Sequence, residues 1–246
     1  MKSILNTSIL SLFLLGILSC NGQKINESAT FKTSQDLQIQ KTEVKYDRDL
    51  EQLVFTITVA GKAGASLPDK VGQLDGAPVL GYVFPTNLKA TDVGFSNTDG
   101  IVALALTSHP DFDDTPLWDE NANTIYNDDG IIWHPHWVVL VEDKRVSGGL
   151  SVKQFTEDDE GVKLPPTNPG MPMYMDSPGF PVITKENTIK VVVPLYRLNN
   201  KVDFNFDAVT AYMEVNTSKE DLPMLGVYSV YSIASGNLSL PYEVAN

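Results

Sequence analysis

The sequence predicts an all-β fold, a single β-sandwich or flattened barrel of about ten mostly antiparallel strands. Three observations support this prediction. Apolar and polar residues alternate with a period of two in many segments, as at Leu53, Phe55, Ile57 and Val59. Turn residues such as Asn97-Thr98-Asp99-Gly100 separate these segments at short intervals. Apolar residues at helical spacing are almost absent.

The strands are expected in ten segments along the chain. They cover residues 37–46, 53–59, 79–84, 101–107, 131–141, 150–155, 182–185, 188–193, 208–215 and 226–233. The first two form a hairpin through Asp47-Arg48-Asp49, and residues 182–193 form another around Glu186-Asn187. Residues 131–141 are apolar on both faces, which predicts a central strand. Residues 164–181, rich in Pro, Gly and Met, are expected to form a long ordered loop.

The N-terminal segment predicts export. Lys2 is followed by an apolar stretch over residues 9–18, which matches the core of a signal peptide and is too short to span a bilayer. The stretch ends in Ile17-Leu18-Ser19-Cys20, which resembles the bacterial lipobox. That resemblance implies that residues 1–19 are removed and that Cys20 is lipidated. We therefore expect a lipoprotein of the cell envelope, anchored in the outer membrane.

The rest of the chain is expected to consist of a tether and one domain. The mostly polar residues 20–36 predict a flexible tether, and residues 37–246 form the β domain. Cys20 is the only cysteine, so no disulfide can form within that domain. The net charge of −13 favours cations or neutral ligands as partners and disfavours nucleic acid.

The three histidines of the chain predict a metal site. His134 and His136 are two residues apart in an expected strand, so both side chains point to one face. His109 follows the expected strand 101–107 and can add a third ligand if the two strands are neighbours. Three protein ligands with an open fourth position are typical of catalytic zinc and also suit copper. The alternative is that the histidines are hydrogen-bonded and pack beside Trp133 and Trp137.

Two known families contain a similar histidine pattern. The string His134-Pro135-His136-Trp137 resembles the His-x-His-Trp segment of α-class carbonic anhydrases, in which strand histidines bind zinc. The third histidine of that family comes later in the chain, whereas His109 comes earlier, which indicates shared geometry rather than kinship. The cupin pattern also begins with His-x-His, but Glu142 lies one residue beyond its spacing.

An acidic segment follows His109 and predicts a calcium loop. Seven carboxylates lie between residues 111 and 129 without any Lys or Arg, so they repel one another unless a cation binds. The spacing of Asp119, Asn121 and Asn123, followed by Asn127 and closed by Asp128 or Asp129, is similar to a calcium-binding loop. Thr124 and Gly130 depart from the EF-hand pattern, and the alternative is a solvated loop with Asx-turns. Asp111, Asp113 or Asp114 could also orient an imidazole.

Three alternating methionines offer a second set of soft ligands. Met171, Met173 and Met175 would lie on one face, and thioethers select Cu(I). The alternative, which we favour, is that they pack a proline-rich loop onto the sheet. A mixed His/Met copper site requires this loop to lie near His134 and His136.

The sequence thus predicts an exported, lipid-anchored protein that binds copper or zinc, with calcium as a further ion. A metal ion with an open coordination position could activate a water molecule. The sequence assigns no residue a catalytic role and does not decide whether the protein is an enzyme. The alternative function is a calcium-stabilised lipoprotein without catalytic activity, which binds a glycan or another surface. In that case Trp118, Trp133 or Trp137 would stack on sugar rings.

Overall fold

The computed structural model describes residues 27–69, 74–110, 122–125 and 131–245. Almost all regular structure in this part of the chain is β, which confirms the predicted fold class. None of its helices is long and apolar enough to cross a membrane. The strands form a closed barrel, a four-stranded sheet beside it, and a short two-stranded ribbon.

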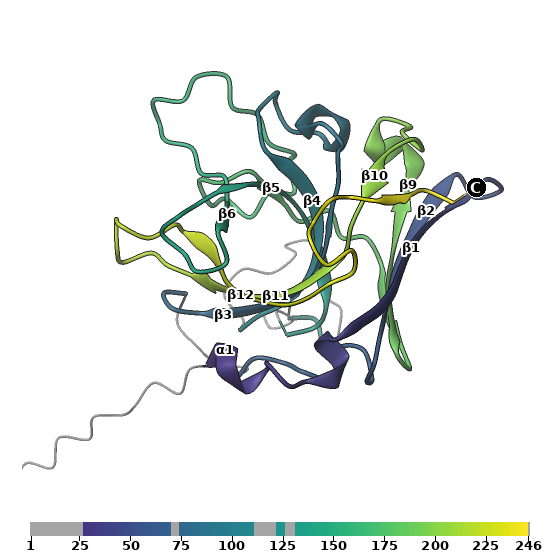
Figure 1. Cartoon of the computed structure of the whole chain (residues 1–246). Helices are drawn as coiled ribbons and strands as arrows, with labels where there is room; N and C mark the ends of the chain where they lie inside the picture. The colour runs from purple at the N-terminus through teal and green to yellow at the C-terminus, as the bar shows by residue number, and fades with distance from the viewer. Residues whose placement is uncertain (1–26, 70–73, 111–121, 126–130, 246) are drawn as a thin grey trace, which may run out of the picture.

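Six antiparallel strands close into the barrel. They are β3 (Pro78–Pro85), β4 (Ile101–Ser108), β5 (His134–Glu142), β6 (Leu150–Val152), β11 (Val209–Val215) and β12 (Leu225–Ile233). The order is β4-β3-β11-β12-β6-β5, and the pairing of β4 with β5 completes the ring, which Figure 1 shows from one end. The short strand β7 (Met175–Asp176) extends the barrel beside β5.

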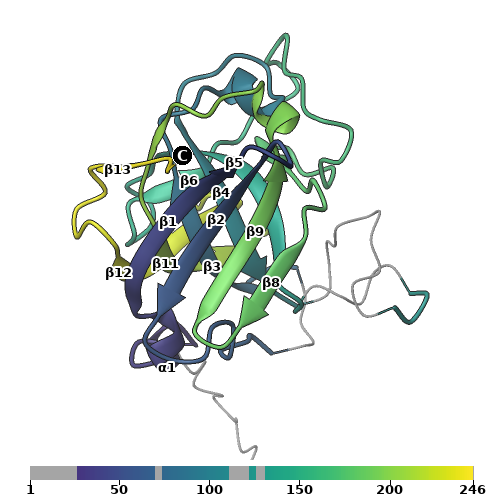
Figure 2. The same cartoon turned by 90° about the vertical axis from the view of Figure 1, so that its right-hand side faces the viewer.

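The four-stranded sheet packs against the outside of the barrel. It has the order β1-β2-β9-β8, with β1 (Ile39–Asp47), β2 (Gln52–Val59), β8 (Val182–Lys185) and β9 (Thr188–Pro194). Figure 2 shows this sheet in front of the barrel strands. Alternate residues of β2 and β9 are buried, so one face covers the barrel and the other faces solvent.

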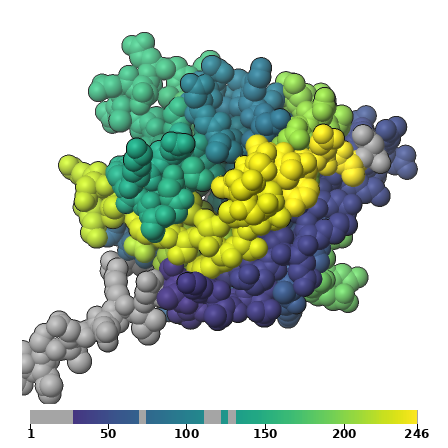
Figure 3. All heavy atoms as spheres, viewed as in Figure 1, coloured from purple at the N-terminus to yellow at the C-terminus, as the bar shows by residue number. Residues whose placement is uncertain are grey.

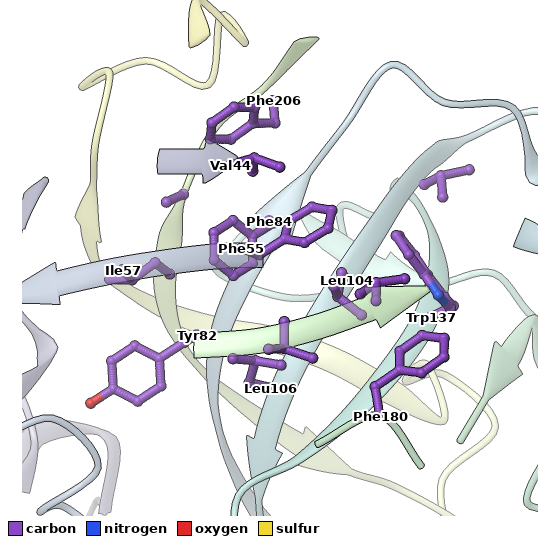
Figure 4. Packing of buried hydrophobic residues seen from close by; sticks show 14 of the residues in the cluster. Val44, Phe55, Ile57, Tyr82, Phe84, Leu104, Leu106, Trp137, Phe180 and Phe206 are labelled. Carbon is purple, nitrogen blue, oxygen red and sulfur yellow. The ribbon is translucent and has the colours of Figure 1, made fainter. Parts of the chain in front are cut away.

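An aromatic core fills the space between the sheet and the barrel (Figure 4). Phe55 of β2 lies at its centre. Its ring packs edge-on against Phe84, with centroids 5.3 Å apart, and against Trp137 at 6.5 Å, and it stacks on Phe204 at 6.1 Å. These offset and edge-to-face arrangements are the favourable ones for aromatic rings. We call this region the outer core.

A second core fills the inside of the barrel. It consists of small and medium apolar side chains, among them Ala103, Ala105, Val138, Ala211 and Met213. All residues of β3 and most of β4, β5 and β11 are buried, because one face of each strand meets the outer core and the other meets the barrel interior. This explains why these strands are apolar without strict alternation.

Segments near both ends of the chain pack on the domain. Near the N-terminus lie the short helices α1 (Glu27–Thr30) and η1 (Gln35–Leu37), and near the C-terminus the two-stranded ribbon of β10 (Asn205–Phe206) and β13 (Tyr242–Glu243). Two further short helices, η2 (Ala90–Val93) and η3 (Leu195–Leu198), lie between these segments in the sequence. In Figure 3 the C-terminal segment, in yellow, lies along the N-terminal strands, in purple, where the backbone N–H of Tyr46 donates to the carbonyl of Ala245.

The structure places part of the expected tether in the folded domain. Phe31 contacts the outer core, the Asp36 carboxylate accepts hydrogen bonds from Ser66, and the hydroxyl of Tyr231 donates to the carbonyl of Ser28. Within residues 20–36, the segment 27–36 therefore packs on the domain. The rest of that segment, with Cys20 and residues 1–19, lies outside the described residues.

The ten expected strands all have counterparts, and both expected hairpins form. The structure adds three two-residue strands, β7, β10 and β13, which are too short to show a periodic pattern. The expected loop 164–181 contains one of them, β7, which pairs with β5. The interior of the barrel is therefore bordered by this loop as well as by the long strands.

Candidate metal centre

Two of the three histidines project from the barrel strand β5, and the third follows the neighbouring strand β4. Thr107 of β4 pairs with His134 of β5, and Ala105 pairs with His136, so the strands that carry the histidines are neighbours, as the metal prediction required. His109 follows directly after β4. Residues two apart on a strand share a face, and Ala105, Val138 and Leu140 on this face belong to the interior core. The imidazoles therefore lie at one end of the barrel interior.

The rings are close enough to share one ion. One ligand atom from each histidine lies within 4.8 Å of the other two, and all three residues are buried. His109 Nε2 and His134 Nε2 are 2.9 Å apart. Two nitrogens bound to one metal at 2.0–2.1 Å would be about 2.9 Å apart at a right angle and about 3.3 Å apart at the tetrahedral angle. This group of three histidines could thus hold a metal ion.

Backbone carbonyls determine which nitrogens face each other. His109 Nδ1 lies 2.9 Å from the carbonyl of Pro110, and His134 Nδ1 lies 2.6 Å from the carbonyl of Ile132. A carbonyl only accepts hydrogen bonds, so each Nδ1 carries the proton and each neutral ring presents a lone pair at Nε2. Two lone pairs 2.9 Å apart repel unless a positive charge, a proton or a metal ion, lies between them.

The third ring is oriented by the neighbouring strand β7. The His136 ring donates a hydrogen bond to the backbone of Asp176, and Ser177 Oγ lies 3.0 Å from its Nδ1. The Ser177 contact thus engages Nδ1 of this ring. The ring centroid of His136 is 4.9 Å from that of His134 and 6.2 Å from that of His109. A proton can bridge only two of these nitrogens, whereas a metal ion can be coordinated by all three.

Burial favours the neutral form of His109 and of His136 in the absence of metal. It lowers the pKa of His109 to about 3, and the charge of His134 acts in the same direction. Burial likewise holds the pKa of His136 well below its usual value, and His134 and His109 add to that shift. Neutral imidazole is the form that binds metals, so the rings need not release protons when an ion arrives at neutral pH.

The methionine loop lies beside this group. All three methionines contact the interior core, and Met171 and Met175 line a cavity of about 30 Å³ together with His109 and His136. Met173 is fully buried and does not line that cavity. Met171 and Met175 thus lie beside His136, one of the two histidines that the mixed His/Met site requires, whereas His134 does not line this cavity.

Several candidate residues lie outside the described part of the chain. These are Cys20, Asp111, Asp113, Asp114, Trp118, Asp119, Asn121 and Asp128. Of the calcium candidates, Asn123 is described, and its side-chain oxygen accepts a hydrogen bond from the backbone N–H of Ile125 at 2.7 Å. Trp133 and Trp137 are buried in the outer core, so neither can stack on a glycan, which weakens the alternative function.

Sequence reasoning did not identify Thr107 or Ser177 as part of this site. Thr107 Oγ1 lies 3.5 Å from His134 Nε2, and Thr107 also lines the cavity with His109 and His136. Its position, two residues before His109 on the same strand face, was the available signal. Ser177 offered none, because its approach depends on the pairing of β7 with β5.

Comparisons with known proteins assign no family to this arrangement. No family model, no curated protein and no solved structure matches the chain.

Proposed function

We propose that this protein is a lipid-anchored protein of the cell envelope that binds copper through His109, His134 and His136, inside one end of its β-barrel. The observation that supports the metal is the approach of His109 Nε2 and His134 Nε2 to 2.9 Å, with both protons directed to carbonyls. The lipobox-like segment that ends at Cys20 supports the anchor.

The methionines favour copper over zinc. Zinc is bound by nitrogen, thiolate and carboxylate ligands, whereas thioether sulfur is a soft ligand that selects Cu(I). Met171 and Met175 line the cavity that His109 and His136 also line. A reduced copper ion at the three imidazoles would thus have thioethers beside it, and zinc would gain nothing from them.

The first experiment measures metal content. Protein purified without added metal and then titrated with Cu(I) or Zn(II) should bind one ion per chain. The double variant His134→Gln and His136→Gln should lose this ion, because two of three ligands are absent. Thr107→Val is the matched control, since it alters a neighbour that is not a ligand. Unchanged metal content in the double variant would rule out the histidine site.

The second experiment identifies the ion. The double variant Met171→Leu and Met175→Leu should lower the affinity for Cu(I) at least tenfold and leave the affinity for Zn(II) unchanged. Met173→Leu is the control, because Met173 packs in the same interior but does not line the histidine cavity. Leucine preserves the volume of methionine, so all three substitutions should be tolerated. Equal Cu(I) affinity in the double variant and the unmodified protein would make zinc the better assignment.

A further inference from the structure

The barrel interior contains a cavity next to the candidate metal centre, which we call the chamber. It has a volume of about 50 Å³. A single water molecule needs roughly 10–15 Å³ by the same measure, so the chamber has room for a molecule of more than one heavy atom. Fourteen residues line it, and all are apolar except Thr107 and His136.

The chamber and the histidine cavity are neighbours along the barrel. The cavity between His109 and Met171 shares Thr107, His136 and Met175 with the chamber. His136 therefore contacts both spaces. A molecule in the chamber would lie beside His136, within the interior core.

The chemistry of the walls determines what the chamber can bind. An ordered water needs two to four polar partners, and an apolar cavity without them stays dry and accepts apolar guests. An ion would lose its hydration without gaining a counter-charge from valine, alanine and leucine side chains. The small volume excludes larger organic molecules. The remaining class is a neutral molecule of about two heavy atoms.

We infer that the chamber binds a neutral diatomic molecule, such as dioxygen or nitric oxide, and presents it to the metal held by His109, His134 and His136. Three protein ligands leave a coordination position for an added ligand. The existence of the chamber depends only on the barrel, whereas its role beside a metal rests on the proposed function.

Xenon tests the chamber without any metal. Metal-free protein should bind one xenon atom in the barrel, detected by ¹²⁹Xe NMR and in xenon-pressurised crystals. Ala105→Val adds two carbon atoms at the chamber wall and should weaken xenon binding at least tenfold. Ala103→Val is the matched control, on the same strand and face but outside the chamber lining. Equal xenon affinity in Ala105→Val and the unmodified protein would overturn the inference.

A second pair of variants covers the case in which Ala105→Val or Ala103→Val does not fold. Val138→Thr keeps the volume of a chamber residue but offers a hydroxyl to water, and should also abolish xenon binding. Val191→Thr makes the same change in the outer core and should leave xenon binding within twofold. Equal xenon affinity in Val138→Thr and the unmodified protein would show that xenon binds away from this wall, and would overturn the inference.

Carbon monoxide tests the link to the metal. With Cu(I) bound, carbon monoxide should give an infrared C–O stretch, and Ala105→Val should lower its affinity at least tenfold at unchanged copper content. Equal affinity in Ala105→Val and Ala103→Val would overturn the inference while the copper centre stands. Failure of the protein to take up copper on titration, with xenon binding intact, would instead reject the proposed function, and with it the role of the chamber beside a metal.

Discussion

Backbone groups accept hydrogen bonds from all three histidines. Pro110 and Ile132 accept the Nδ1 protons of His109 and His134 through their carbonyls, and the Asp176 backbone accepts from His136. In many metal sites a carboxylate or a carbonyl in this role orients the ring and selects the tautomer. Here backbone groups of the same chain orient the rings, which directs the lone pairs before an ion arrives.

The low pKa values predict that the metal-free protein is destabilised by acid. His109 is neutral when folded down to a pH of about 3, whereas an unfolded histidine takes up a proton below about 6.5. In that window the unfolded state binds more protons, so the free energy of unfolding falls as the pH falls. The slope is about 1.4 kcal/mol per pH unit for one histidine, and His136 adds to it in the same direction.

Urea unfolding of chelator-treated protein between pH 7 and pH 5 measures this slope. His109→Gln should reduce it, because glutamine does not titrate, and should leave the slope from His136 in place. A free energy of unfolding that stays constant over this range would show that the rings are charged in the folded protein.

At the level of single residues, the sequence allowed part of the site to be predicted. The shared face of His134 and His136 follows from strand geometry, whereas His109 joins them only because its strand pairs with theirs, which the sequence left as a condition. The carbonyl partners could not be predicted, since every residue has a carbonyl and only the folded chain selects Pro110 and Ile132. The calcium loop and Cys20 stay predictions, because they lie outside the described residues.

Among the six barrel strands, β6 is the shortest and has the fewest pairs with a neighbour. Only one register pair, Gly226 with Ser151, joins it to β12. The turn before β6 supplements this pairing, because the backbone N–H of Gly148 donates to the carbonyl of Val227 at 2.9 Å. A Cβ atom on Gly148 would lie 2.5 Å from that same oxygen, so the close approach requires glycine.

Gly148→Ala should therefore destabilise the barrel by about 1–3 kcal/mol, because backbone atoms must separate to admit the methyl group. Gly81→Ala is the control: its Cβ would meet the terminal methyl of Met213 at 2.7 Å, and a flexible side chain can move. Chemical denaturation should show the larger loss for Gly148→Ala, with faster amide exchange in β12. Equal losses would mean that the turn does not support closure.

The strands themselves were largely predictable, whereas barrel closure was not. Alternation in β2 and β9 indicates one buried face, and the apolar runs of β3 and β4 indicate two. That pattern suits the centre of a sandwich and the wall of a covered barrel equally well. The choice depends on long-range pairing of β4 with β5 and on the three-residue β6, neither of which produces a local signal.

Over the whole molecule, two cores meet at the barrel wall. The outer core combines large aromatic rings with aliphatic side chains, and the interior core consists of small and medium apolar side chains with the histidines at one end. The outer core and the candidate site thus lie on opposite sides of the same strands. A substitution in the outer core should affect the free energy of unfolding without removing the metal ligands.

Phe55→Ala tests this separation. It should lower the free energy of unfolding by about 3–5 kcal/mol, because a fully buried ring that contacts three aromatic neighbours leaves a cavity. Leu50→Ala, at a side chain that is 65% exposed, should change it by less than about 0.5 kcal/mol. Copper per folded chain should be unchanged in both variants. Loss of copper in Phe55→Ala would show that the cores are coupled.

The two-sided burial of β5 has a consequence for how such a chain can vary. Trp137 and Val139 enter the outer core, while His136 and Val138 enter the barrel. Because side chains alternate along a strand, inserting one amino acid within β5 ahead of His136 would exchange these sets and force the Trp137 indole into the barrel interior, beside the imidazoles. Descendants of this sequence should therefore tolerate insertions in the loops that flank β5 but not within the strand.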